Sequence, residues 1–101
     1  MEGARVLIVE DELIIGMHIK SMLTSRGYRV IGPVPTGEEA LSLAEAEAPD
    51  ILLLDIILDG KMDGTQTYRA IKNILDIPAV YLTAHSDAAT LKRARETSPY
   101  G

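Results

Sequence analysis

The sequence lacks several residue types that particular functions require. It contains no cysteine, so disulfide bonds and thiolate metal sites are excluded. It has no phenylalanine or tryptophan and only four tyrosines, which disfavours functions that depend on aromatic stacking. Its net charge of −5 argues against a nucleic-acid surface, because such a surface needs a basic patch. No apolar run approaches the roughly 18 residues of a membrane span. We therefore expect a cytoplasmic domain with no membrane contact and no direct nucleic-acid contact.

What the sequence does contain is a regular alternation of two patterns. A chain of 101 residues with 47% hydrophobic content is sufficient for one domain with a modest core. Short aliphatic runs predict strands at 4–9, 29–34, 51–55 and 79–82. Helical spacing and capping signals predict helices at 12–26, 37–47, 65–75 and 86–96. Strands that alternate with helices predict an α/β fold, a doubly wound parallel sheet with right-handed crossovers.

Individual residues refine this prediction. The aliphatic run at 51–54 indicates a central strand that is buried on both faces. Asp11 is placed to be the N-cap of the first helix, and Thr36 with Glu39 has the spacing of a capping box. The helical spacing predicts buried residues on the first three helices: Ile15, Ile19, Met22, Leu23, Ala40, Leu41, Ala44, Tyr68, Ile71 and Ile74.

Acidic residues follow two of the predicted strands. Glu10 and Asp11 come after the first strand, Asp55 ends the third, and Thr83 follows the fourth. The carboxyl ends of parallel strands form one edge of a sheet, which is where ligands bind. Carboxylates that meet there repel each other unless they take up protons or share a cation, and an all-oxygen group suits Mg²⁺. Helix capping and a strand-end turn are the simpler alternatives, but capping does not account for Asp55.

Five segments together resemble the receiver domain of two-component response regulators. They are Val-Leu-Ile-Val-Glu-Asp-Glu at 6–12, Thr-Gly-Glu-Glu-Ala-Leu at 36–41, Leu-Leu-Leu-Asp-Ile at 52–56, Met-Asp-Gly at 62–64 and Tyr-Leu-Thr-Ala at 81–84. Each motif is short, but four of them occur in order at the ends of the predicted strands, and the segment at 36–41 matches the start of the family's second helix. The resemblance covers essentially the whole chain and implies a flavodoxin-like fold with strand order 2-1-3-4-5.

The resemblance also implies a role for each matching residue. Asp55 would accept a phosphoryl group from a histidine kinase, a phosphotransfer domain or a small phosphodonor. Glu10 and Asp11 would bind Mg²⁺ with Asp55, and the backbone carbonyl of Ile57 would complete the protein ligands. Thr83 would turn its hydroxyl toward the aspartyl phosphate and so report phosphorylation. The domain would then be a signalling switch, with autodephosphorylation, and not an enzyme that turns over a separate substrate.

The sequence departs from this family at its end. The family continues with a Lys-Pro pair, a fifth strand and a fifth helix, whereas this chain stops at Gly101. We therefore expect residues 1–101 to be a receiver domain that is truncated at its C-terminus. The strand at 79–82 would become an exposed apolar edge, and self-association through it is expected. Phosphorylation should be impaired without the lysine.

Three other functions remain as alternatives. A binding module on the same fold that is never phosphorylated is the main one. A phosphohydrolase with an aspartate nucleophile is the second; that class has another acid two residues after the nucleophile, and Ile57 at this position argues against it. A flavodoxin-like cofactor binder is the third, and it is disfavoured because no Ser/Thr/Gly-rich phosphate-binding loop follows the first strand. On the first helix, Ile14 and Met17 are candidates for contact with a kinase helix, with core packing as the alternative.

Overall fold

The computed structural model describes residues 3–56, 58 and 60–82. In chain order the elements are β1 (Arg5–Val9), α1 (Leu13–Ser25), β2 (Arg29–Val34), α2 (Gly37–Glu47), β3 (Ile51–Asp55), α3 (Gly64–Lys72) and β4 (Ala79–Leu82). The bounds of β2, α2, β3 and β4 are those predicted. β1 begins one residue later than predicted, α1 is one residue shorter at each end, and α3 begins one residue earlier and ends three residues earlier. The helix predicted at 86–96 lies outside the described residues.

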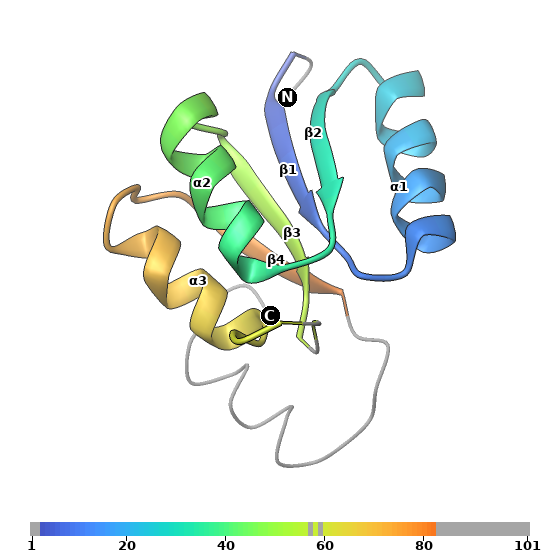
Figure 1. The fold of residues 1–101 in the computed structure, drawn as a ribbon. Coiled ribbons are helices and arrows are strands. Elements are labelled where there is room, and N and C mark those ends of the chain that lie inside the picture. The colour runs from blue at the N-terminus through green and yellow to red at the C-terminus, as the bar shows by residue number, and fades with distance from the viewer. Residues whose placement is uncertain (1–2, 57, 59, 83–101) are drawn as a thin grey trace.

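The four strands form one parallel sheet in the order β2-β1-β3-β4. Figure 1 shows α2 and α3 on one face of the sheet and α1 on the other. This arrangement is a doubly wound flavodoxin-like sheet, and it confirms the predicted order over the four strands. All carboxyl ends of the strands lie at one edge, because every strand pair is parallel.

The main core lies between the sheet and the pair α2 and α3. Alternate strand residues supply the sheet side, and small residues of α2 let that helix approach closely. The fully buried members of this core are Leu7, Val9, Leu52, Leu54, Ala40, Ala44, Ile71 and Ala79. Tyr68 of α3 completes it and meets the Tyr81 ring edge-on, with centroids 6.4 Å apart. Removing this apolar surface from water is the main force that holds the layers together.

The opposite face of the sheet is less well covered. Leu52 and Leu54 are fully buried, but Ile51 and Leu53, which point the other way, are only half-buried. The expectation that β3 is buried on both faces is therefore correct for one face only. The reason is the position of α1, which packs over β2 and β1 among the described residues.

Helix α1 is also more exposed than its apolar spacing predicts. Ile15 and Met22 are 39% and 42% exposed, so their predicted burial is wrong, and the only fully buried residue of the helix is Gly16. A Cβ atom on Gly16 would lie 2.8 Å from Pro33 on β2, so this glycine fixes the contact face. The N-cap of α1 is Glu12, so the prediction of Asp11 as the N-cap is wrong.

The ends of α2 and α3 show two different caps. Thr36 accepts a hydrogen bond from the Glu39 amide at 3.2 Å, so the predicted N-cap of α2 is confirmed, but the reciprocal bond of the predicted capping box is not formed. A capping box with both hydrogen bonds occurs at α3, where Asp63 and Gln66 form it. Because α3 ends at Lys72, Ile74 lies beyond the helix and is 46% exposed, so the prediction that it is buried is wrong.

Strand β4 forms one edge of the described sheet. Val80 in this strand is 36% exposed. Self-association through β4 stays a prediction. Within the described part of the chain, no helix is long and apolar enough to cross a membrane.

Candidate functional site

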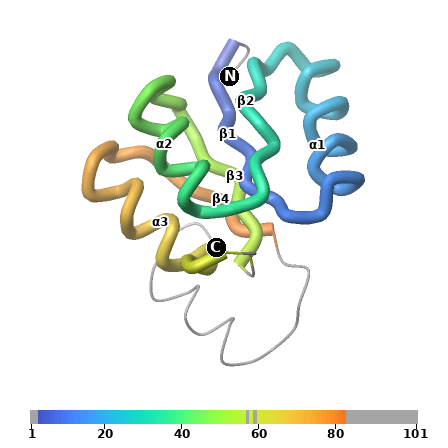
Figure 2. The backbone as a smooth tube through the Cα atoms, in the orientation of Figure 1, coloured from blue at the N-terminus to red at the C-terminus, as the bar shows by residue number. Residues whose placement is uncertain are grey.

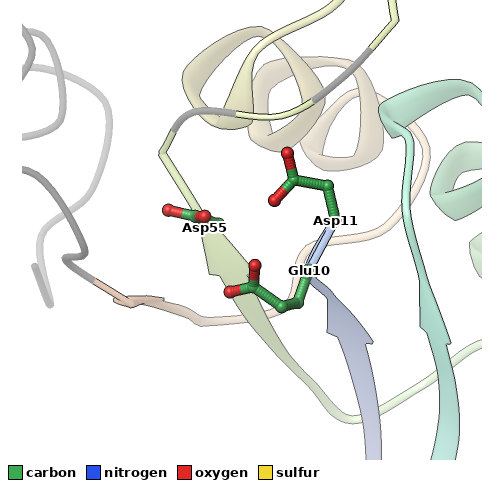
Figure 3. A group of neighbouring side chains, drawn as sticks. All are labelled: Glu10, Asp11 and Asp55. Atoms are coloured by element: carbon green, nitrogen blue, oxygen red, sulfur yellow. The ribbon is translucent and has the colours of Figure 1, made fainter. Parts of the chain in front are cut away.

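Three carboxylates meet at the carboxyl edge of the sheet. Strands β1 and β3 are neighbours with Val9 opposite Leu54, so the next residues, Glu10 and Asp55, lie side by side. Asp11 follows in the turn that leads to α1. One oxygen atom from each of the three side chains lies within 4.8 Å of the others. Figure 3 shows the three carboxylates turned toward a common space.

Burial makes this group of charges unfavourable without a partner. Glu10 and Asp55 are each 3% exposed, and Asp11 is half-buried. Burial raises the pKa of Glu10 from 4.5 to about 7, and the nearby charges of Asp55 and Asp11 add to this rise. A hydrogen bond from the Glu12 amide to Glu10 Oε1, 3.0 Å long, acts in the opposite direction and orients the carboxylate. The site therefore favours the binding of a proton or a cation.

The donor set fits a hard divalent cation. Carboxylate oxygens are the preferred protein ligands of Mg²⁺, whose octahedral shell places opposite ligands about 4.2 Å apart. The 4.8 Å spread of the three oxygens is close to this value, so a small side-chain movement or one intervening water would let all three share an ion. His18 is exposed on α1 and is not part of the group, and His85 lies outside the described residues.

A glycine holds the strand end that carries Asp55. The Gly64 amide donates a hydrogen bond to the Ile56 carbonyl at 2.6 Å. A Cβ atom at Gly64 would overlap the Asp55 carbonyl oxygen and would lie 2.7 Å from Ile56 Cα. The start of α3 is therefore in direct contact with the backbone at the end of β3. The sequence alone indicated only a turn or helix-start glycine here, because this contact depends on how α3 packs.

Two of the predicted site residues are not placed by the structure. Thr83 and Ile57 lie outside the described residues. The structure thus brings together Glu10, Asp11 and Asp55, and the roles of all five residues stay predictions.

The fold and the site define a class of protein. A parallel α/β sheet that presents a buried acidic group beside a strand-end aspartate is suited to metal-assisted phosphoryl chemistry. Comparison with known families is specific: the model of the response regulator receiver domain matches residues 6–100. The chain belongs to this family, the receiver domains of two-component response regulators, which are generally signalling proteins.

Curated relatives are named as transcriptional regulators. The chain is 38% identical over 92 residues to transcriptional regulatory protein PdtaR of Mycobacterium tuberculosis. This match covers 91% of this chain and 44% of that protein. It is 38% identical over 89 residues to transcriptional regulatory protein YvrH of Bacillus subtilis, with 88% and 37% covered. The chain therefore spans less than half the length of both relatives.

Solved structures of receiver domains share this fold. The signal receiver domain of a modulated diguanylate cyclase from Desulfovibrio desulfuricans G20 superposes with a TM-score of 0.89 and 35% identity, over 95% of this chain and 76% of that one. The receiver domain of the putative response regulator NarL from Mycobacterium tuberculosis gives a TM-score of 0.82 and 28% identity, over 97% and 80%.

Proposed function

We propose that this domain accepts a phosphoryl group on Asp55 from a histidine kinase or a phosphotransfer domain, in a reaction that requires Mg²⁺. The observation that supports the proposal is the convergence of Glu10 and Asp11 on Asp55, with their carboxylate oxygens within 4.8 Å. Membership of the receiver-domain family supports this reaction class. The domain acts as a signalling switch and releases its own phosphoryl group by hydrolysis.

The residues of the site divide the work. Asp55 supplies a carboxylate oxygen that attacks phosphorus; the P–N bond of the phosphohistidine breaks, and the freed imidazole nitrogen keeps the electron pair and takes a proton. A carboxylate needs no general base for this attack. Glu10 and Asp11, with the Ile57 carbonyl, hold the metal beside Asp55. When bound, Mg²⁺ offsets the negative charge of the transferring phosphoryl group.

The response to phosphorylation is assigned to Thr83. Asp55 is paired with Leu82, the last residue of β4, so a phosphoryl group on Asp55 would offer acceptor oxygens near the end of this strand, which Thr83 follows in the sequence. We propose that the Thr83 hydroxyl donates a hydrogen bond to one of them and thereby changes the surface of the domain. The matching Tyr-Leu-Thr-Ala motif at 81–84 supports this assignment.

The surface that receives the phosphodonor protein is assigned to the start of α1. Leu13 and Ile14 are 67% and 85% exposed, and Met17 one turn later is 47% exposed. These side chains begin two residues after Asp11, so they border the acidic site. A protein that brings a phosphohistidine to Asp55 must cover this border. We therefore assign these three residues to the contact with a helix of the kinase or phosphotransfer domain, whose apolar side chains they match.

Output and location extend the same proposal. The relatives are named as transcriptional regulators. By analogy we propose that the domain controls a regulator of transcription in the cytoplasm, with nucleic-acid contact left to other parts of such a protein. The acidic character of the chain, with a net charge of −5, supports this division.

The test is incorporation of phosphoryl groups from acetyl phosphate with and without Mg²⁺. The proposal predicts labelling, even if below one phosphoryl group per chain, that requires the metal and is lost in Asp55→Asn, which keeps the shape of the side chain but not its nucleophilic charge. Absence of labelling would contradict the proposal. If Mg²⁺ still bound in that case, a non-phosphorylated interaction module would be the better description.

A further inference from the structure

The connection between β3 and α3 rests on the first turn of α2. The Met62 amide donates a hydrogen bond to Glu38 Oε1 at 3.2 Å, across 24 residues of sequence. Gly60 approaches the same carboxylate so closely that a Cβ atom there would lie 2.7 Å from Glu38 Oε2. Both oxygen atoms of Glu38 are thus directed at residues 60–62.

A second contact supports this seating. A Cβ atom on Gly37 would lie 3.1 Å from Met62 Cβ and would overlap Thr67 Oγ1 on α3. The starts of α2 and α3 therefore lie side by side, as the backbone tube shows (Figure 2). Because the two helix starts are packed together, the Glu38 side chain is held beside the Met62 amide that it binds.

The other end of the same connection is fixed at the nucleophile strand. Gly64 donates to the Ile56 carbonyl and lies against the Asp55 carbonyl oxygen. The connection is therefore attached at its base to the strand that carries Asp55 and, further out, to Glu38. A shift of residues 60–62 relative to α2 would act on Gly64, which follows them in the chain, and through its contact on the backbone of Asp55.

From this geometry we propose that Glu38 is a positioning residue for the acidic site. It holds residues 60–62, and with them Gly64, so that Gly64 keeps its contact with the Asp55 backbone when Mg²⁺ binds. Glu38 does not touch the metal or the phosphoryl group; it acts through the Met62 amide. This inference rests on the proposed function, because it concerns the same Mg²⁺ site.

The variants separate the hydrogen bond from the charge. Glu38→Ala removes the acceptor and the charge, whereas Glu38→Gln removes only the charge and keeps an oxygen that can accept from Met62. Glu39→Ala is the matched control, since it removes the same charge from the same helix turn, where the side chain of Glu39 is exposed. Gly60→Ala would crowd the Glu38 carboxylate at Oε2, but it would also strain the backbone, because Gly60 has φ +95°; it is therefore not used as a variant.

The first measurement is amide hydrogen exchange at Met62 in the metal-free protein. Glu38→Ala should speed this exchange about threefold to tenfold, the range expected for one solvent-accessible hydrogen bond, while Glu38→Gln and Glu39→Ala leave it near the wild-type rate. Exchange at Met62 that is equally fast in Glu38→Ala and Glu39→Ala would overturn the inference.

The second measurement is the Mg²⁺ dissociation constant, from calorimetric or NMR titration. We expect a threefold to tenfold weaker constant in Glu38→Ala and a constant near the wild-type value in Glu38→Gln and Glu39→Ala. A wild-type constant in Glu38→Ala would overturn the positioning role while leaving the proposed function standing. A wild-type protein that binds no Mg²⁺ would overturn both.

Discussion

The backbone of Gly64 lies against the carbonyl oxygen of Asp55, at a distance that leaves no room for a side chain. This contact joins the start of α3 to the last residue of β3, and so it couples the packing of a helix to the position of the proposed nucleophile. The arrangement gives the acidic site a rigid support at the point where the strand ends.

Replacement of Gly64 by alanine should therefore disturb both stability and the site. The added Cβ meets backbone atoms, which cannot move aside as a flexible side chain would. We expect a loss of about 2 kcal/mol or more in the free energy of unfolding, measured in urea. Ser42→Ala on the exposed face of α2 serves as the control and should change it by less than about 0.5 kcal/mol. Equal stability of the two variants would show that the contact is unimportant.

The raised pKa of Glu10 makes the stability of the metal-free protein depend on pH. Its folded-state value of about 7 exceeds the ordinary 4.5, so the folded state holds this proton more tightly than the unfolded state does. This contribution to stability is complete below pH 4.5 and is lost as the pH rises through about 7. Urea unfolding from pH 5 to 8 should show that Glu10→Gln loses less stability than the wild type over this range.

Glu12→Gln is the control for that experiment, because Glu12 is the neighbouring exposed acid. It should follow the wild-type dependence. If Glu10→Gln and the wild type lost stability in parallel, Glu10 would not contribute to the pH dependence, and the account of a pKa raised by burial would be wrong.

Mg²⁺ and the Glu10 proton compete for the same oxygen atoms. Metal affinity should accordingly rise as the pH increases toward about 7 and change little above pH 8. Titration calorimetry in buffers of different ionisation enthalpy should detect proton release on binding at pH 6.5. An affinity that does not vary between pH 6 and 8 would contradict the assignment of Glu10 as a ligand.

The exposed start of α1 should matter for protein phosphodonors only. Ile14→Ser should slow transfer from a histidine kinase that phosphorylates the wild-type chain by about tenfold or more, the effect of losing one well-buried apolar contact. Labelling by acetyl phosphate should stay the same, because that donor does not touch α1. Met22→Ser, farther along the same helix and 42% exposed, should affect neither reaction. Equal slowing with both donors would mean that the substitution disturbs the site itself.

Much of this architecture could be predicted from local patterns. Aliphatic runs defined β2, β3 and β4, and the rule that parallel strands end at one edge predicted that Glu10, Asp11 and Asp55 would meet. Spacing alone could not show which apolar residues a neighbour covers. Ile74 has helical spacing but lies beyond the end of α3, and is exposed.

Contacts between distant elements were the harder part. The close approach of Gly16 to Pro33 sets which face of α1 is inward, and no local signal marks it. The hydrogen bond from Met62 to Glu38 joins residues 24 apart and depends on how α2 meets α3. The spacing of Asp63 and Gln66 was a readable capping signal that the sequence analysis missed.

The most direct test of the central claim is the position of the phosphoryl group after reaction with acetyl phosphate and Mg²⁺. Peptide mass spectrometry should place the group on Asp55. The group should not form when Mg²⁺ is chelated before acetyl phosphate is added, nor in Asp55→Asn. A phosphoryl group on Glu10, Asp11 or His18, or labelling that persists in Asp55→Asn, would contradict the account.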